Sequence, residues 1–295
     1  MAERNYIIDF FSSFTPNDIE FNFHDFLENY LTEGCCPPEY KQSFDLEVRH
    51  LRRHEDGVIS GVFAKIRKDH LPHAGRTGQQ ERELDLEDDE GLVEKNHFLA
   101  YRENSLLVMQ ANRHAGTAIA LGHYLSRFAG HSVAFDPVLQ PDAMQRLMRG
   151  DLHPVSVQAG FARPTNPDLY PEDDWSEALM DLLSGAGGSY VKLSINSDLR
   201  SDDDDTNRLK DAMRHAWRSI KGMPKVRSLK MDMANDDGIV YPIDLIADRL
   251  KDKVTVDVRG RYPIESDMFT SMAAAKEGLN DSLESIFGNP SANLA

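Results

Sequence analysis

The spacing of hydrophobic positions in the first part of the chain predicts strands with one helix between them. Residues 6–11 are rich in aromatic and β-branched side chains, which favour a strand. Apolar residues at helical spacing predict a helix over 23–31. Alternation over 44–48, a Glu-Asp-Gly turn at 55–57 and a returning apolar run over 58–66 predict a hairpin.

The rest of the chain mixes short strands with helices. Strands are predicted near 98–101, 106–109, 133–135, 155–161, 190–195, 226–233 and 254–258. Helices are predicted over 115–128, 175–183, 206–220, 243–250 and 266–287, with another that begins at Pro141. Because several strands follow one another as hairpins, the pattern predicts an α+β fold in two subdomains, with mixed, mainly antiparallel sheets and packed helices.

One acidic segment is the best candidate for a domain boundary. Residues 81–94 contain eight carboxylates and one arginine, which is typical of a solvated surface segment. The sequence therefore predicts a strand–helix–hairpin subdomain over 1–80, an acidic linker over 81–94, a central α+β domain over 95–265, and a terminal helix and tail over 266–295.

Composition narrows the class of protein further. The 295 residues are 40% hydrophobic and 28% charged, which is ordinary for a globular protein, and the net charge is −16. No apolar run approaches the ~20 residues that span a bilayer, and the first residues do not resemble a signal peptide. Cys35 and Cys36 are adjacent, a spacing that strains a disulfide. These features predict a cytoplasmic protein without direct membrane insertion.

The motifs in the sequence assign no catalytic residue. The glycines of 185–188 follow a predicted helix and precede a predicted strand, which is the reverse of a phosphate-binding loop. The histidine pairs His50/His54 and His70/His73 lack a third ligand at metal-site spacing, so neither a metal nor another cofactor is expected. The sequence leans toward a protein that is not an enzyme. A metal-dependent nuclease stays open as an alternative, with ligands from Asp45, Glu47 or the Asp202–Asp205 run.

Basic residues gather in two places despite the acidic total. The predicted helix 206–220 places cations on one face, and the hairpin 49–68 carries a second group. If the two groups share a surface, they can neutralise DNA phosphates. The candidate nucleic-acid-binding residues are Arg208, Lys210, Arg214, Arg218, Lys221, Lys225, Arg227, Arg52, Arg53, Arg67 and Lys68. The alternative is that these cations pair with carboxylates of the same chain, including Asp202–Asp205.

The last predicted helix carries an apolar stripe that can face the chain's own core or a second copy. Its members recur at three- and four-residue steps. We expect a homodimer through Met268, Met272, Leu279, Leu283 and Ile286, and packing on the chain's own core remains open.

The order of elements resembles that of the RexA-type phage-exclusion proteins and, more distantly, of KwaB from the Kiwa defence system. The likeness begins at Asp88-Asp89-Glu90-Gly91-Leu92 and the hairpin that starts at Phe98. It continues through the helix 115–128, the strand over 135–139, the segment near Met148 and the strand 155–161, and it includes Asp181-Leu182-Leu183-Ser184-Gly185-Ala186. The resemblance implies an intracellular, DNA-associating and dimer-forming sensor or effector that acts beside a small membrane protein, with DNA contact at 206–221.

These observations lead to a main hypothesis and two alternatives. We expect a bacterial anti-phage defence component that binds DNA, in double-stranded form and without sequence specificity, through backbone phosphates. The alternatives are the metal-dependent nuclease and an acidic protein–protein interaction module that does not bind nucleic acid.

Overall fold

A computed structural model describes residues 2–14, 21–33, 37–112, 114–162, 190–197, 209, 226–260 and 262–288. Within these residues every strand pairing is antiparallel and helices pack on the sheets, which confirms the predicted α+β class. The contacts divide the chain into two units. The first unit comprises Met1–Val138 and Lys251–Ala295, and the second comprises Leu139–Leu250.

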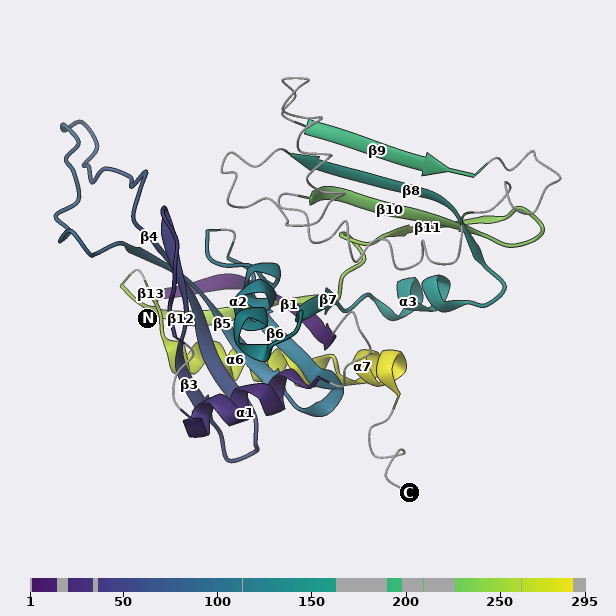
Figure 1. Ribbon diagram of the computed structural model, residues 1–295, viewed down its shortest axis with the longest axis horizontal. Helices are drawn as coiled ribbons and strands as arrows, with labels where there is room; N and C mark the ends of the chain where they lie inside the picture. The colour runs from purple at the N-terminus through teal and green to yellow at the C-terminus, as the bar shows by residue number, and fades with distance from the viewer. Residues whose placement is uncertain are drawn as a thin grey trace. The chain divides into compact units, whose positions relative to one another are not determined.

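The first unit is built on one large antiparallel sheet (Figure 1). Its strands, in spatial order, are β13 (Tyr262–Pro263), β12 (Lys251–Arg259), β1 (Ala2–Phe14), β6 (Leu106–Gln110), β5 (Leu92–Tyr101), β4 (Ile59–Arg67), β3 (Phe44–Arg53) and β2 (Glu39–Tyr40). β7 (Ala134–Pro137) pairs with the end of β1. The ladder between β1 and β12 joins the two ends of the chain, with Ala2 opposite Val258.

Two helices cover one face of this sheet. α1 (Phe23–Glu33) and α2 (Ala118–Ala129) bury their apolar sides against β3, β4, β5 and β6. α2 starts where the Thr117 side chain accepts a hydrogen bond from the Ala120 amide, and it ends at Gly130, whose φ of 73° suits glycine. The buried centre of this layer consists of Phe23, Leu27, Phe63, Phe98, Leu121 and Tyr124.

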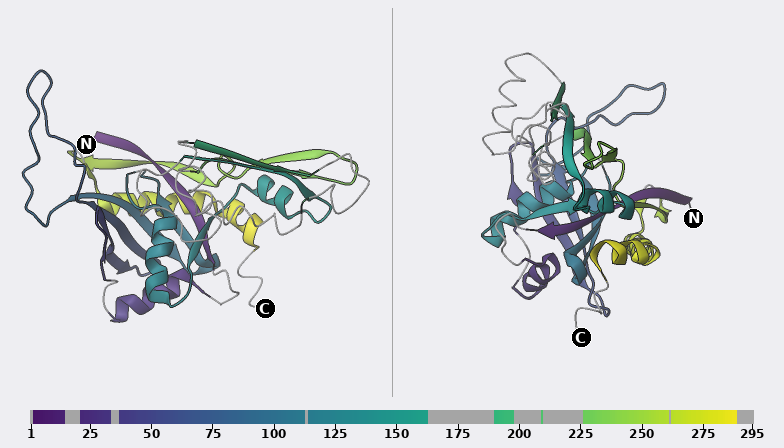
Figure 2. Two further views of the ribbon diagram at one scale, coloured as in Figure 1. Left: turned by 45° about the horizontal axis from the view of Figure 1, so that its top comes forward. Right: turned by 90° about the vertical axis from the view of Figure 1, so that its right-hand side faces the viewer.

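The opposite face of the sheet is covered by α6 (Glu265–Gly278), which contacts β12, β5 and β6 and is followed by α7 (Asn280–Phe287). Side chains alternate along a strand, so neighbours on β5 face different layers. Phe98 points into the layer of α1 and α2, whereas the ring of His97 lies 5.5 Å from that of Phe269 on α6. Figure 2 shows α6, in yellow, on the side of the sheet away from α1.

The apolar stripe of the terminal helix packs on its own chain. Met268 and Met272 are completely buried and Leu283 is nearly so, while Leu279 and Ile286 are half-buried. The expectation that these side chains form a dimer contact is therefore wrong for the three buried residues, because a second copy cannot reach them. The helix also breaks at Leu279, so that α6 and α7 take the place of one continuous helix.

The second unit is a smaller antiparallel sheet with one described helix. The strand order is β11 (Val240–Asp244), β10 (Val226–Ala234), β8 (His153–Ala162) and β9 (Tyr190–Asn196). α3 (Pro141–Met148) contacts β11, and the core gathers Leu139, Ala143, Leu147, Val157, Met231 and Ile243. The predicted helix 175–183 lies outside the described residues, and so does the predicted helix 206–220 apart from Leu209.

The predicted helix over 243–250 is wrong. β11 ends at Asp244 and turns follow. The Asp244 carboxylate accepts hydrogen bonds from the amides of Ile246 and Ala247, at 3.0 and 2.9 Å. An aspartate that binds the following amides in this way offers the backbone an alternative to a helix.

The acidic segment 81–94 does not separate two bodies. Its residues 81–91 belong to the connection between β4 and β5, and its last three residues begin β5. These strands pair along their length, from Ile59 opposite Ala100 to Arg67 opposite Leu92. Residues on both sides of the segment therefore share one sheet. The chain instead passes from the first unit to the second after Val138 and returns to the first unit after Leu250.

We predict that Met272→Ala lowers the free energy of unfolding by about 2–5 kcal/mol, because it leaves a cavity under α6. Urea unfolding followed by circular dichroism measures this effect. Ile286→Ala is the control, since the half-buried Ile286 leaves less of a cavity. A Met272→Ala variant of unchanged stability but altered solution mass would contradict the packing described for α6.

Candidate nucleic-acid interface and polar clusters

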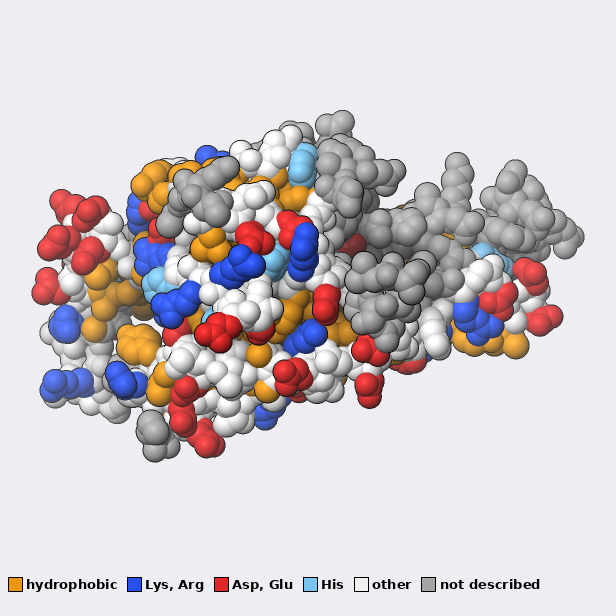
Figure 3. Space-filling view, turned by 90° about the horizontal axis from the view of Figure 1, so that it is seen from below, with side chains coloured by type: hydrophobic (Ala, Val, Ile, Leu, Met, Phe, Trp, Pro, Cys, Tyr) orange, Lys and Arg blue, Asp and Glu red, His pale blue; other side chains and the backbone are white. Residues whose placement is uncertain are grey.

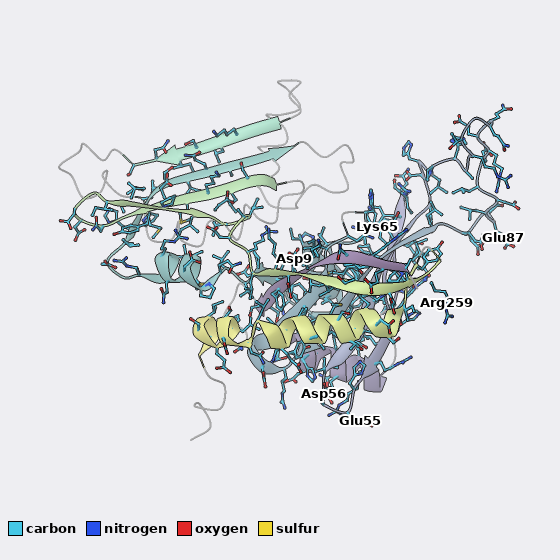
Figure 4. The ribbon with its side chains drawn as sticks, turned by 180° about the vertical axis from the view of Figure 1, so that it is seen from behind. Asp9, Glu55, Asp56, Lys65, Glu87 and Arg259 are labelled. Carbon is cyan, nitrogen blue, oxygen red and sulfur yellow. The ribbon has the colours of Figure 1, made fainter. Side chains whose placement is uncertain are left out.

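The four predicted DNA-binding residues of the hairpin lie at its two ends. Arg53 pairs with Ile59 beside the turn, whereas Arg67 pairs with Phe44 at the far end of β4. At about 3.3 Å per residue, the two ends are roughly 27 Å apart. In Figure 4, Asp56 lies at the turn and Lys65 at the opposite end of the hairpin. The structure therefore does not bring Arg52 and Arg53 together with Arg67 and Lys68.

Two of these four cations already have carboxylate partners. The Arg53 guanidinium lies 2.6 Å from Glu28 of α1, and Lys68 Nζ lies 2.6 Å from the buried Asp45. Arg52 is exposed. Ion pairs within the chain, which the sequence left open as an alternative, are thus present for two of the four hairpin cations.

The other predicted binding residues are not described. Arg208, Lys210, Arg214, Arg218, Lys221 and Lys225 lie outside the described residues, as do Asp202–Asp205. Arg227 belongs to β10, but its side chain is outside the described part.

Cations nevertheless gather at the end of the sheet that carries Arg67. Lys41 and Lys65 lie over the Phe44 ring, with Nζ 5.6 and 4.4 Å from its centroid, and Lys68 Nζ lies 5.7 Å from the centroid of Tyr40. We call this group the basic edge patch, and its members are Tyr40, Lys41, Phe44, Lys65, Arg67 and Lys68. Lys65, Arg67 and Lys68 belong to the basic group that the sequence places on the hairpin 49–68, whereas Lys41 joins them only through the pairing of β2, β3 and β4.

Cations and carboxylates lie together in the basic edge patch, and the central lysine is partly buried. Burial lowers the pKa of the Lys65 ammonium, and the Arg67 guanidinium lowers it further, against the opposing effects of Glu94 and Asp69. Two other carboxylates lie in the patch, since Glu39 is 3.6 Å from Lys41 and Asp45 is bound to Lys68. Lys65 and Arg67 are thus the cations least compensated by ion pairs.

The acidic loop leaves the sheet from this same end. β4 ends at Arg67 and β5 begins at Leu92, so the connection between them starts beside the basic edge patch. It runs outward as a long loop (Figure 1), and Glu87 is labelled far out on it in Figure 4. Its carboxylates from Glu81 to Glu90 are exposed.

A cavity of about 430 Å³ lies at the other end of the hairpin. It is lined by charged groups of both signs, among them His24, Glu28, Arg53, Arg102, Glu103 and Lys276. Figure 3 likewise shows acidic and basic side chains interspersed over the face that it draws. This mixture favours neither a polyanion nor a polycation.

His24, Asp25 and Glu28 in this region could hold a metal, because their ligand atoms lie within 4.8 Å of one another. His24 Nε2–H donates to the Gly57 carbonyl at 2.7 Å, and Nδ1 lies 3.2 Å from Asp25. Both carboxylates are already bound by guanidinium groups, Glu28 by Arg53 and Asp25 by Arg102 at 3.1 Å. We therefore interpret this cluster as an ion-pair network at the start of α1.

Of the nuclease ligands suggested by the sequence, only Asp45 and Glu47 lie among the described residues. Asp45 and Glu47 lie two residues apart on β3, on the face away from α1. Asp45 is bound to Lys68, and Glu47 forms an ion pair with Arg49. Neither carboxylate is left for a cation.

A further polar cluster lies between the sheet and the start of α6. His97 is 1% exposed, and Glu265 approaches it from the first turn of α6, with Lys95 and His50 nearby. Burial lowers the pKa of the His97 imidazole, against a hydrogen bond from its Nδ1–H to Gln110 Oε1 at 2.7 Å. Spacing in the sequence pairs His50 with His54 instead. The contact with Glu265 spans 215 residues, and no local signal reveals it.

The protein is thus an α+β protein with an inserted second sheet and, in its described part, no helix long and apolar enough to cross a membrane. The family model that matches it, DUF6731, is described as a family of unknown function and covers residues 53–276. Since this match spans more than half of the chain, the chain belongs to that family. No curated protein matches it.

Proposed function

We propose that this protein is an intracellular anti-phage defence component that binds double-stranded DNA through backbone phosphates, without reading the sequence. The observation that supports this proposal best is the basic edge patch, where three lysines lie over two aromatic rings and Arg67 lies opposite Phe44 at one end of the sheet. Cation–ring contacts hold ammonium groups in place without neutralising them. Such a group can release counterions from DNA when it contacts phosphates.

Because the net charge of the chain is negative, its attraction for DNA phosphates depends on where these cations lie. At physiological salt, charges more than about 8 Å apart are largely screened, so a local cluster acts on a nearby phosphate more strongly than the net charge of −16 does. Lys65 and Arg67 contribute most, because Lys41 and Lys68 share their charge with Glu39 and Asp45.

The resemblance to RexA-type and KwaB proteins supplies the rest of the proposal. It implies a second DNA contact at 206–221, a homodimer, and a small membrane protein as a partner. The homodimer would need a surface other than the buried residues of α6 and α7.

We predict that Arg67→Gln weakens binding to all duplex sequences alike and reduces the salt slope of log K by about 1. Fluorescence anisotropy of a labelled duplex at several salt concentrations measures both quantities. Arg52→Gln is the matched control, since it removes the same charge from the other end of the hairpin and should change neither value. Equal effects of the two substitutions would count against a localised contact.

The acidic loop should oppose DNA binding, because its carboxylates start beside the basic edge patch. We predict that Asp88→Asn combined with Asp89→Asn strengthens duplex binding at low salt by a few-fold, and that the gain fades as salt rises. Asp281→Asn with Glu284→Gln removes the same charge from exposed positions on α7 and serves as the control. If both pairs strengthen binding equally, the net charge rather than the loop is responsible.

Charge reversal at Arg214 and Arg218 tests the helix that the resemblance singles out. We predict that the double change to glutamate abolishes retention of duplex DNA in a gel shift at low salt.

A plasmid incubated with the unchanged protein and Mg²⁺ or Mn²⁺ should stay intact; cleavage would favour the nuclease. The absence of retention at any salt concentration would favour the protein–protein interaction module.

A further inference from the structure

The register of four strands lines up one residue from each at the end of the sheet that carries the basic edge patch. Tyr40 of β2 lies opposite Asp45 of β3, which in turn lies opposite Ile66 of β4. Ile66 lies opposite Val93 of β5. Residues directly opposite one another point to the same face of a sheet, so these four share the face away from α1. With neighbouring strands about 4.8 Å apart, they span roughly 14 Å.

Three of these four side chains are apolar and reach the surface. Tyr40 is 75% exposed and Val93 is 46% exposed, and Ile66 between them is half-buried. We call Tyr40, Ile66 and Val93 the apolar row. α6 lies over the same face further along β5, where its first residue, Glu265, pairs with Lys95. The apolar row is therefore an exposed surface, and contacts with phosphates alone give it no role.

The carboxylates on this part of the face are compensated by cations. Asp45 is 6% exposed, and its carboxylate lies 2.6 Å from Lys68 Nζ. Glu47, the next residue of β3 on the same face, forms an ion pair with Arg49. The Lys68 ammonium also lies 5.7 Å from the centroid of the Tyr40 ring. A polyanion that reaches Tyr40 thus meets a cation first.

The basic edge patch extends around the edge strand to both faces of the sheet. Phe44 belongs to the core beside α1, and Arg67 opposite it and Lys65 over its ring lie on that side. Tyr40 lies on the other side, and β2 is the last strand in the spatial order. A DNA strand that crosses this edge can therefore place its phosphates on cations and its bases on the apolar row.

An exposed aromatic ring beside cations suits unpaired bases. Every base has a flat π face, and stacking on an aromatic side chain tolerates any sequence. The faces of a base inside a duplex are covered by its neighbours, so such a base cannot stack on Tyr40 unless it leaves the duplex. A four-stranded sheet has room for two or three unpaired bases on its face.

We propose that the apolar row binds unpaired DNA bases, so that the protein prefers a duplex that continues into a single strand over a fully paired one. This inference rests on the proposed function, because it takes the basic edge patch as the part that contacts DNA phosphates. Tyr40 provides the stacking surface, and Ile66 and Val93 shield the next base from water. Neither contact reads the sequence.

Fluorescence anisotropy of the full chain with three labelled duplexes tests this preference. The first duplex is blunt, the second carries an unpaired extension of about six nucleotides, and the third carries an extension of the same length without bases. The second and third have the same phosphates, so their comparison separates stacking from charge. We expect the second duplex to bind roughly tenfold more tightly than the third at the same salt concentration.

Substitutions assign this affinity ratio to Tyr40. The ratio should fall to about one in Tyr40→Ala and persist in Tyr40→Phe, because stacking needs the ring and not the hydroxyl. Tyr262→Ala is the matched control, since Tyr262 is 73% exposed on β13 at the other end of the strand order and should not change the ratio. Arg67→Gln should weaken the binding of all three duplexes and preserve the ratio.

The outcomes separate this inference from the proposed function. A ratio near one for the unchanged chain, or a ratio that stays high in Tyr40→Ala, would overturn the role of the apolar row while leaving the binding of blunt duplexes in place. Binding of the second duplex alone, lost in Tyr40→Ala, would support the apolar row and overturn the duplex part of the proposed function. Failure to bind any of the three would overturn both.

Discussion

The ladder between β1 and β12 is the constraint on which the first unit depends. It pairs Ala2 with Val258 and runs on to Asp9 opposite Lys251, so residues about 250 positions apart in sequence lie side by side. β1 is also paired with β6 and β7 on its other side. Because β12 leads through β13 into α6, this ladder brings α6 over β5 and Glu265 over His97. Contacts of such long range form late in folding and slowly.

The same ladder explains how a second unit fits into the chain. The second unit begins and ends at neighbouring points, since Leu139 bridges to Arg249 and the Gln140 amide donates to the Asp248 carbonyl at 2.7 Å. Insertions are tolerated where the two ends of the inserted segment lie close together. The first unit can therefore be interrupted after Val138 and resume at Lys251 without breaking its sheet.

Patterns among neighbouring residues predicted the strands and helices that short-range interactions stabilise. The strand at β1, the hairpin of β3 and β4, and α2 with its end at Gly130 follow from alternation, turn residues and capping. The helix predicted over 243–250 failed where one carboxylate, that of Asp244, binds the following amides. Periodicity also showed that the stripe of Met268 and Met272 is buried, but not what buries it. The partner is β12 together with strands more than 150 residues earlier.

The sequence shows which side chains are charged but not which of them form ion pairs. The ion pairs decide which charges are left to bind a partner. Arg53 and Arg67 look alike in the sequence, yet one is bound to Glu28 and the other lies beside Lys65 at the far end of the hairpin. An acidic run that looked like a linker is a loop between paired strands. The register of β3, β4 and β5 therefore determines which cations lie close together, and the sequence alone does not show that register.

Two adjacent residues of β5 show why an unpaired polar atom is informative. Asn96 is buried on one face of the sheet, where its amide donates to the Gly116 carbonyl and its oxygen accepts from the Asn112 amide. It is satisfied on both sides, as structural polar residues in a core usually are. His97 is equally buried on the other face, but only one of its ring nitrogens is satisfied by a hydrogen bond within the described residues. These two neighbours on one strand are equally buried but differ in their pairing, because the opposite faces of the sheet meet different partners.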